Sequence, residues 1–282
     1  MKVRMIVLFL ASAAVLALVI PGLLGGLRVT RYAVDAGSIA QPVRIALVTD
    51  LHSCAYGTGE RELLDAIDAE APDLVLLGGD IFDDTLPDDN TEVFLAGIAG
   101  KYPCWYVTGN HEHRSGEHAF AAKMDILARL GIQRLSGATV AVEANGQRFT
   151  LCGVDDPRAW QKTDAETDDS QLGYETQLKQ VAEQADPDSY TVLLAHRPEF
   201  AGLYSRLGFD LVLSGHAHGG QWRIPGLLNG LYAPNQGLFP RYAGGRYALD
   251  GTTLIVSRGL ARESTLIPRL YNRPELVIVE LR

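Results

Sequence analysis

The chain has 282 residues, 47% of them hydrophobic, which is enough to build one large α/β domain or two small ones. Its formal net charge of −9 argues against a nucleic-acid partner, because proteins that bind the phosphate backbone normally present a basic face. Three scattered cysteines without CxxC spacing do not make a disulfide framework.

The first predicted element is an apolar segment at the N-terminus. Lys2 and Arg4 precede an uncharged stretch over residues 5–24, about the length of a membrane-spanning helix. A cleavable signal peptide has a shorter apolar region that ends in small residues, whereas the alanines here lie inside the stretch. We therefore expect an uncleaved transmembrane signal anchor within residues 1–30, with a late-cleaved signal as the alternative, and a linker over residues 31–42. Flanking charges favour a cytoplasmic N-terminus only slightly.

Five short apolar runs, each bounded by Gly and polar residues, predict buried strands in the rest of the chain. They cover residues 43–48, 74–77, 105–107, 191–194 and 211–213. A polar motif follows each run, and these motifs hold five of the seven histidines: Asp50-Leu51-His52, Gly79-Asp80, Gly109-Asn110-His111, His196, and Gly215-His216-Ala217-His218. Ligands bind at the carboxyl ends of strands in open α/β sheets, so the five motifs predict one shared site.

Helical and hairpin patterns separate these strands. Residues 58–71 predict a helix that ends before Pro72, and a stripe of Phe120, Met124 and Leu127 predicts another that closes at Gly131. The Asn-Gly pair at residues 145–146 predicts a hairpin between strands at 139–143 and 148–154.

Three further segments complete the pattern. Residues 162–170 carry four acidic side chains and predict a solvated loop. Residues 225–247 are rich in Gly, Pro and aromatic residues and show little periodicity, which is typical of a long functional loop. Residues 276–281 predict a final strand.

The residue types in the five motifs suit a pair of divalent metal ions. Two ions about 3.5–4 Å apart need a shared anionic oxygen ligand, which a carboxylate supplies and an imidazole cannot. Imidazole ligands favour transition metals such as Mn, Fe, Zn or Ni over Mg or Ca. Such ions lower the pKa of bound water towards about 7, which provides a hydroxide nucleophile, and they stabilise charge on phosphoryl oxygens. Each motif alone is weak evidence, but their conjunction at strand ends predicts a two-metal hydrolytic site.

This conjunction resembles the calcineurin-like metallophosphoesterase family over residues 43–282. The resemblance implies two facing β-sheets flanked by helices, here after one N-terminal transmembrane helix. It implies that one metal is held by Asp50, His52, Asp80 and His218 and the other by Asn110, His196 and His216, with Asp80 as the bridge. It also implies that His111 faces the substrate phosphate as the catalytic residue, which protonates the leaving group or stabilises developing charge.

Further motifs resemble the bacterial membrane-anchored branch of this family. They are His196-Arg197-Pro198-Glu199, Gly215-His216-Ala217-His218-Gly219-Gly220-Gln221, Pro268-Arg269 and Arg273-Pro274-Glu275. That branch is similar to phosphodiesterases assigned to UDP-diacylglucosamine and other lipid-linked phosphates. Arg197 is a candidate phosphate clamp, although a salt bridge to Glu199 or another carboxylate is an equal alternative. Phe239 and Tyr242 are candidates for lining a substrate pocket, although packing of the loop is the commoner use of such aromatics.

The sequence thus predicts a membrane-anchored phosphoesterase with two divalent metals (Mn, Fe or Zn) that hydrolyses a phosphodiester or pyrophosphate bond in a phosphate-ester substrate, with a lipid-linked phosphate as one candidate. We expect a single-pass protein of the cell membrane with its catalytic domain on the outer side. The alternatives are a phosphomonoesterase or protein phosphatase on the same metal site, and a non-catalytic metal-binding membrane scaffold.

Overall fold

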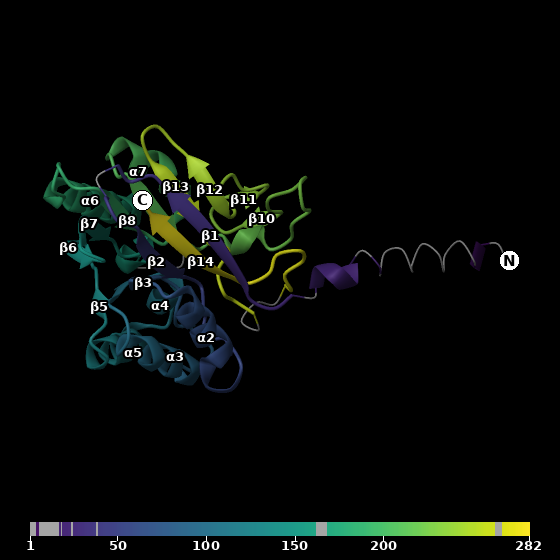
Figure 1. Ribbon diagram of the computed structural model, residues 1–282. Helices are drawn as coiled ribbons and strands as arrows, with labels where there is room; N and C mark the ends of the chain where they lie inside the picture. The colour runs from purple at the N-terminus through teal and green to yellow at the C-terminus, as the bar shows by residue number, and fades with distance from the viewer. Residues whose placement is uncertain are drawn as a thin grey trace.

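Two six-stranded β-sheets face each other, and helices cover their outer faces (Figure 1). The computed structural model describes residues 25–37, 39–161, 168–262 and 267–282, together with residues 4–5, 17 and 19–23 of the N-terminal segment. The predicted arrangement of two facing sheets flanked by helices is therefore confirmed.

The first sheet has the strand order β1-β14-β2-β3-β4-β5 and is parallel except where β14 meets β2. Its strands are β1 (Arg28–Val34), β2 (Val43–Val48), β3 (Leu74–Gly78), β4 (Cys104–Val107), β5 (Gln133–Arg134) and β14 (Glu275–Leu281).

The second sheet has the order β12-β13-β9-β8-β7-β6, with parallel strands at its centre and an antiparallel pair at each edge. Its strands are β6 (Ala138–Ala144), β7 (Gln147–Gly153), β8 (Thr191–Leu194), β9 (Leu211–Ser214), β12 (Gly245–Ala248) and β13 (Thr253–Val256). A small separate hairpin is formed by β10 (Tyr232–Ala233) and β11 (Gly237–Leu238).

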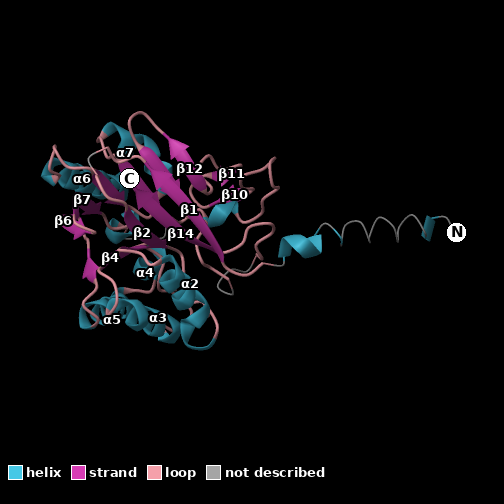
Figure 2. Cartoon of the chain, viewed as in Figure 1, coloured by secondary structure: helices cyan, strands magenta, loops and turns pink. Residues whose placement is uncertain are grey.

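Each sheet is covered on its outer face by its own group of helices (Figure 2). The first sheet packs against α2 (Arg61–Glu70), α3 (Asp89–Ala99) and α5 (Glu117–Arg129), and the second against α6 (Asp168–Gln184) and α7 (Ala201–Arg206). Short helical segments lie in the connections: α4 (Asn110–Arg114), η1 (Thr58–Glu60), η2 (Pro157–Trp160), η3 (Pro198–Phe200) and η4 (His218–Gly220).

Strand β2 shows how the layers are built from the sequence. Ile45 and Leu47 point into the core between the sheets, whereas Ala46 and Val48 point into the core under the helices of the first sheet. Successive side chains of a strand alternate between faces, and here both faces are buried, which is why the sequence shows a continuous apolar run. Each fully buried aliphatic side chain of this kind contributes about 1.5–3 kcal/mol relative to an exposed one.

The parallel strands bring their carboxyl ends to one edge of the sandwich. The backbone N–H of Asp50, after β2, donates to the carbonyl of Gly79, after β3, over 3.0 Å. The N–H of Gly215, after β9, donates to the carbonyl of His196, after β8, over 3.1 Å. The N–H of His216 then donates to Asp50 Oδ1 across the two sheets over 2.9 Å. The loops that carry the polar motifs therefore lie against one another.

Several local predictions are confirmed. A helical segment runs from Thr58 through α2 and stops at Ala71, and α5 is followed by Gly131 in the left-handed region. β6 and β7 form the predicted hairpin, with both turn residues, Asn145 and Gly146, at positive φ. Cys104 and Cys152 are buried and free.

Other predictions need correction. The residues expected to be a linker over 31–42 begin with most of β1, which pairs with β14 over seven residues, so the folded domain starts at Arg28. The acidic stretch was expected to be a loop throughout, but Asp168–Gln184 is helical; residues 162–167 lie outside the described residues. The long loop at 225–247 contains the β10–β11 hairpin and the start of β12.

The predicted transmembrane helix falls largely outside the described residues. Among the residues that the structure describes, no helix has the length and apolar character needed to cross a membrane. The described part of this segment meets the domain at Gly22, whose carbonyl accepts a hydrogen bond from the backbone of Tyr271 over 2.7 Å.

Candidate metal centre

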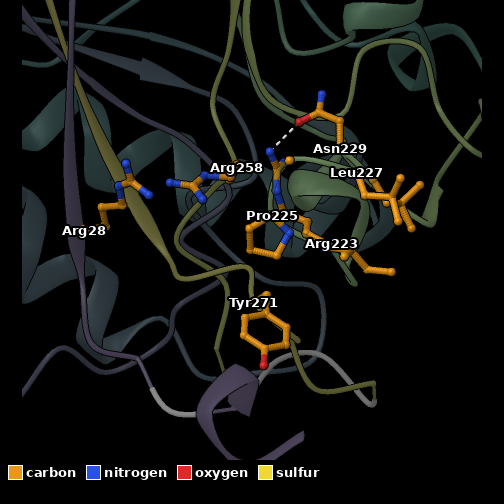
Figure 3. A pocket seen from close by; sticks show the side chains of 10 residues that line it. Arg28, Arg223, Pro225, Leu227, Asn229, Arg258 and Tyr271 are labelled. Atoms are coloured by element: carbon orange, nitrogen blue, oxygen red, sulfur yellow. Dashed lines mark hydrogen bonds between the residues drawn. The ribbon is translucent and has the colours of Figure 1, made fainter. Parts of the chain in front are cut away.

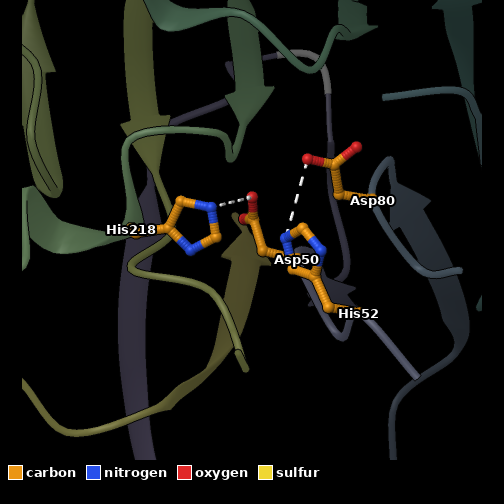
Figure 4. A group of neighbouring side chains, drawn as sticks. All are labelled: Asp50, His52, Asp80 and His218. Atoms are coloured by element: carbon orange, nitrogen blue, oxygen red, sulfur yellow. Dashed lines mark ion pairs between the residues drawn. The ribbon is translucent and has the colours of Figure 1, made fainter. Parts of the chain in front are cut away.

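Six of the seven predicted ligand side chains form two adjoining clusters. Asp50, His52, Asp80 and His218 each offer a ligand atom, and these atoms all lie within 4.8 Å of one another (Figure 4). Asp80, His196 and His216 form a second group on the same criterion. Asp80 belongs to both, so its carboxylate is the only link between two potential cation sites among these groups of described residues.

Asn110, the seventh residue, is placed by its two neighbours. An ideal Cβ on Gly109 would collide with Asp80 Oδ1, and the N–H of His111 donates to the same oxygen over 2.8 Å. Asn110 is buried between them, and its Oδ1 has no hydrogen-bond partner. The amide oxygen is thus available close to the Asp80 carboxylate.

The loops hold these side chains in unusual backbone conformations. Five of the seven residues have φ between 46° and 65°, a region that costs energy for residues other than glycine: Asp50, His52, Asp80, His216 and His218. Gly215 also needs its missing side chain, because a Cβ there would collide with Asp50 Oδ2. Sharp turns at the strand ends therefore point several polar groups at one spot, at an energetic cost that the surrounding fold supports.

A buried atom without a hydrogen-bond partner remains on every one of the seven side chains. These atoms are Asp50 Oδ2, His52 Nε2, Asp80 Oδ2, Asn110 Oδ1, His196 Nε2, His216 Nδ1 and His218 Nδ1. His196 Nε2 lies 3.1 Å from Asp80 Oδ2, at ion-pair distance, but the two do not make a hydrogen bond of good geometry. Leaving one buried polar group unsatisfied costs about 1–3 kcal/mol, so seven converging ones fit a site that cations complete.

Neighbouring groups fix which nitrogen of each imidazole faces this site. His52 Nδ1 is 3.0 Å from Asp83 Oδ2, and His196 Nδ1 is 2.8 Å from the carbonyl of Gly78. Both acceptors require a proton on Nδ1, which leaves the lone pair on Nε2. His216 Nε2 is 3.0 Å from Asn235 Oδ1, so its lone pair is on Nδ1. Partners of this kind orient metal-ligating histidines.

The electrostatics of the centre are those of charges buried together. Burial raises the pKa of Asp50, whereas for Asp80 the neighbouring His196 outweighs burial and holds the pKa well below its ordinary value. Burial lowers the pKa of His196, but the charge of Asp80 outweighs it and raises the pKa to about 10. Burial holds the pKa of His216 well below its ordinary value, as it does for His218. Without metal, the cluster therefore combines an anionic carboxylate with neutral imidazoles, a donor set that suits divalent transition metals.

His111 lies beside the two clusters and is more exposed than they are. Its ring stands edge-on to His52, with ring centres 4.4 Å apart, and its side chain is 22% exposed. Its Nδ1 is 2.7 Å from Asp84 Oδ1, so the proton on Nδ1 donates to that carboxylate. The opposite nitrogen is then left to act on a ligand bound at the centre.

The three residues predicted to bind substrate have different surroundings. Arg197 is buried, with its guanidinium bound by Asp156 through two hydrogen bonds and by Glu199 at 3.3 Å, which is the salt-bridge alternative. Tyr242 is buried and packs edge-on against Tyr247, which is the packing alternative. Phe239 is 67% exposed.

Four residues that support the centre were missed from the sequence. Asp83 orients His52, Asp84 orients His111, and Asn235 orients His216. The buried carboxylate of Glu112 accepts hydrogen bonds from the backbone of Gly109 and of residues 80–82, and burial raises its pKa to about 7. The two aspartates just after Gly79-Asp80 were a usable signal. Asn235 was not, because only the fold brings it to His216.

Together, the strand-end loops and the buried His/Asp clusters define a metal-dependent phosphoesterase. A family model described as calcineurin-like phosphoesterase matches residues 43–220, which includes every one of the seven residues, and the chain belongs to that family.

Individual relatives agree with this classification. The chain is 28% identical to the phosphodiesterase YaeI of Escherichia coli over 86% of this chain and 83% of that protein. It is 30% identical to the bovine (Bos taurus) transmembrane protein with metallophosphoesterase domain, over 83% of this chain and 52% of that protein. Among solved structures, TT1561 of Thermus thermophilus shares the fold, with a TM-score of 0.51 at 12% identity over 77% of this chain and 89% of that one.

Proposed function

We propose that this protein is a membrane-anchored phosphodiesterase or pyrophosphatase that works with two divalent metal ions. The observation that carries the proposal is the set of seven converging side chains, each with one buried atom that no protein group satisfies. One ion is assigned to Asp50, His52, Asp80 and His218, and the other to Asp80, Asn110, His196 and His216.

Bound ions would acidify a water molecule and neutralise the oxygens of a phosphoryl group. The chain's own residues supply the rest of the chemistry. Asp83, Gly78 and Asn235 hold three imidazoles in the tautomers that present a lone pair to the centre. His111, held by Asp84 on one nitrogen, donates a proton from the other to the leaving oxygen.

Mn, Fe or Zn are the metals proposed, because the donor set mixes imidazole nitrogens with carboxylate oxygens. Cleavage of a diester or pyrophosphate is preferred to cleavage of a monoester because a relative of this length, YaeI, is named a phosphodiesterase.

Anchoring and a lipid-linked substrate are proposed from the N-terminus and from one loop. Residues 5–24 carry no charge and are long enough to span a bilayer. A relative is named a transmembrane protein. Six of the twelve large hydrophobic side chains that are exposed in the described residues lie between positions 222 and 239: Trp222, Ile224, Leu227, Tyr232, Leu238 and Phe239. Such a concentration is typical of a surface that meets a membrane or an apolar ligand. We place the catalytic domain on the outer side of the cell membrane and the acyl or polyprenyl chain of the substrate on this loop.

The test is a substrate panel on the metal-loaded full-length protein in detergent. We expect turnover of bis-p-nitrophenyl phosphate with Mn²⁺ and faster turnover of a lipid-linked pyrophosphate such as a UDP-diacylglucosamine analogue. Activity on p-nitrophenyl phosphate that exceeds activity on every diester would support the phosphomonoesterase alternative. A protein that holds two metals but turns over none of these compounds would support the scaffold.

The lipid part is tested separately by replacing Leu238 and Phe239 with Ser. Both side chains are exposed, so the fold should tolerate the change. We expect unchanged turnover of the soluble diester and reduced turnover of the lipid-linked substrate in vesicles. Equal rates for both substrates in the variant would remove the lipid assignment and leave the phosphoesterase chemistry in place.

A further inference from the structure

A second cavity, separate from the metal centre, opens where β1 begins. It has a volume of about 440 Å³ and is lined by Arg28, Arg258, Tyr271 and the loop at 223–229 (Figure 3). A smaller cavity of about 150 Å³ continues from it between the edge strands β1 and β12, and the two share Arg28, Arg223 and Arg258. None of the residues that line either cavity is a proposed metal ligand.

The walls of this cavity carry an excess of positive charge. Three arginines line it, and Glu275 is the only carboxylate among the lining residues. Glu275 is already bound to Arg258 over 2.6 Å and also accepts from Thr30. Arg223 donates to Asn229 and to the carbonyl of Gly219, both uncharged, and Arg28 is exposed. Burial and the charge of Arg258 lower the pKa of Arg223, as expected where cations crowd together.

The rim of the cavity is apolar and faces solvent. Leu227 is 82% exposed and Ile224 is 50% exposed. Monomeric proteins seldom leave such side chains together on a rim unless they contact a membrane or an apolar ligand. A cationic interior with an apolar rim matches a ligand that has an anionic head and a hydrocarbon tail.

The N-terminal segment leaves the domain at the mouth of this cavity. Tyr271, which lines the mouth, donates its backbone N–H to the carbonyl of Gly22 over 2.7 Å. Arg273 binds the carbonyls of Gly26 and Leu27 at 2.9 and 3.1 Å. If residues 5–24 cross a bilayer, these contacts hold the cavity at its surface.

We propose that this cavity binds the phosphate headgroup of an anionic membrane lipid, with the acyl chains passing over Leu227 and Ile224. Arginine suits this ligand because its planar guanidinium forms paired hydrogen bonds to phosphate oxygens. Basic pockets at membrane surfaces commonly recognise anionic lipids. The site is independent of the metal centre, so the proposal stands or falls without the phosphoesterase assignment.

The test is a titration of the full-length protein in detergent with dihexanoyl-phosphatidylglycerol, dihexanoyl-phosphatidylcholine and inorganic phosphate. We expect the anionic lipid to bind at least about tenfold tighter than the zwitterionic one. Arg28→Gln combined with Arg223→Gln should weaken anionic-lipid binding by roughly tenfold or more, because charge-assisted hydrogen bonds to phosphate are among the strong ones. Phosphate also fits a metal centre, so the measured quantity is the difference between wild type and variant.

Three controls make the result decisive. Arg129→Gln changes an exposed arginine on α5 that pairs with Glu92, and should leave lipid binding unchanged. Melting temperature and metal content without lipid show whether the double variant folds; if it does not, Arg28→Gln alone carries the test, since that side chain is exposed. Leu227→Ser should weaken lipid binding but not phosphate binding.

Equal affinity for the two lipids, or unchanged binding in a folded arginine variant, overturns the proposal. Phosphate that binds as tightly as the anionic lipid, with no effect of Leu227→Ser, overturns the lipid assignment and identifies free phosphate as the ligand.

Discussion

Replacing Asp80 by asparagine tests the shared ligand with little change in shape. Asparagine keeps the volume and an oxygen that can accept the 2.8 Å hydrogen bond from the backbone of His111. Its amide nitrogen takes the place of Oδ2, which lies 3.1 Å from His196 Nε2 and 3.7 Å from His52 Nε2. The substitution therefore removes the anion at the junction of the two clusters and preserves the packing.

The expected effect on function is large and the effect on folding is small. Metal content should fall from two ions to one or none, because the only carboxylate common to both groups has lost its charge. Metal ions contribute several kcal/mol to such reactions, and a loss of about 4 kcal/mol corresponds to roughly a 10³-fold lower kcat. The free energy of unfolding of the metal-free protein should change by no more than about 1–2 kcal/mol, since no cavity is created.

The assay combines metal analysis with turnover of bis-p-nitrophenyl phosphate in Mn²⁺, and circular dichroism checks the fold. Asp84→Asn is the matched control: it is the same substitution four positions along the chain, and it should keep both ions while lowering kcat. A folded Asp80→Asn protein that retains two metals and near-normal turnover would refute the two-metal assignment.

Three further predictions follow from the same geometry. His111→Ala should lower kcat by about 10²–10⁴-fold with metal content intact, and by less for p-nitrophenolate leaving groups; loss of a metal would mean that the residue is a ligand. Gly109→Ala should reduce metal content, because its Cβ collides with the Asp80 carboxylate, whereas Gly100→Ala, where a Cβ meets nothing within 4 Å, should not; equal metal content in both would contradict the close approach. Removal of residues 1–24 should leave the melting temperature of the domain nearly unchanged, whereas removal of residues 1–34 should lower it, because it deletes β1 and exposes β14; equal melting temperatures would show that β1 is dispensable.

The same strand corrects the choice of a soluble fragment. From the sequence, residues 31–42 were predicted to be a linker, because β1 carries two exposed arginines and no regular alternation of polar and apolar residues. The strand forms because β14 offers it an edge, and β14 is about 250 residues away in the chain. Pairing over that separation is decided by the tertiary structure and leaves little trace in local pattern.

The sequence determined the site to a large extent because each ligand immediately follows a buried strand. Apolar runs such as residues 43–48 and 74–77 have no alternative to a buried, parallel position, and a parallel strand delivers whatever follows it to one edge of the sheet. The short motifs Asp50-Leu51-His52 and Gly79-Asp80 were therefore enough to predict that their side chains meet.

The tertiary structure alone decided what surrounds those side chains. From the sequence, Arg197 fits a phosphate clamp and a salt bridge equally well, and only the position of Asp156 shows its guanidinium already bound. Asn235 meets His216, and Arg28 comes to lie with Arg223 and Arg258, through contacts between segments far apart in the chain. Such contacts depend on how two sheets and a long loop pack in three dimensions, and a local sequence pattern does not contain that information.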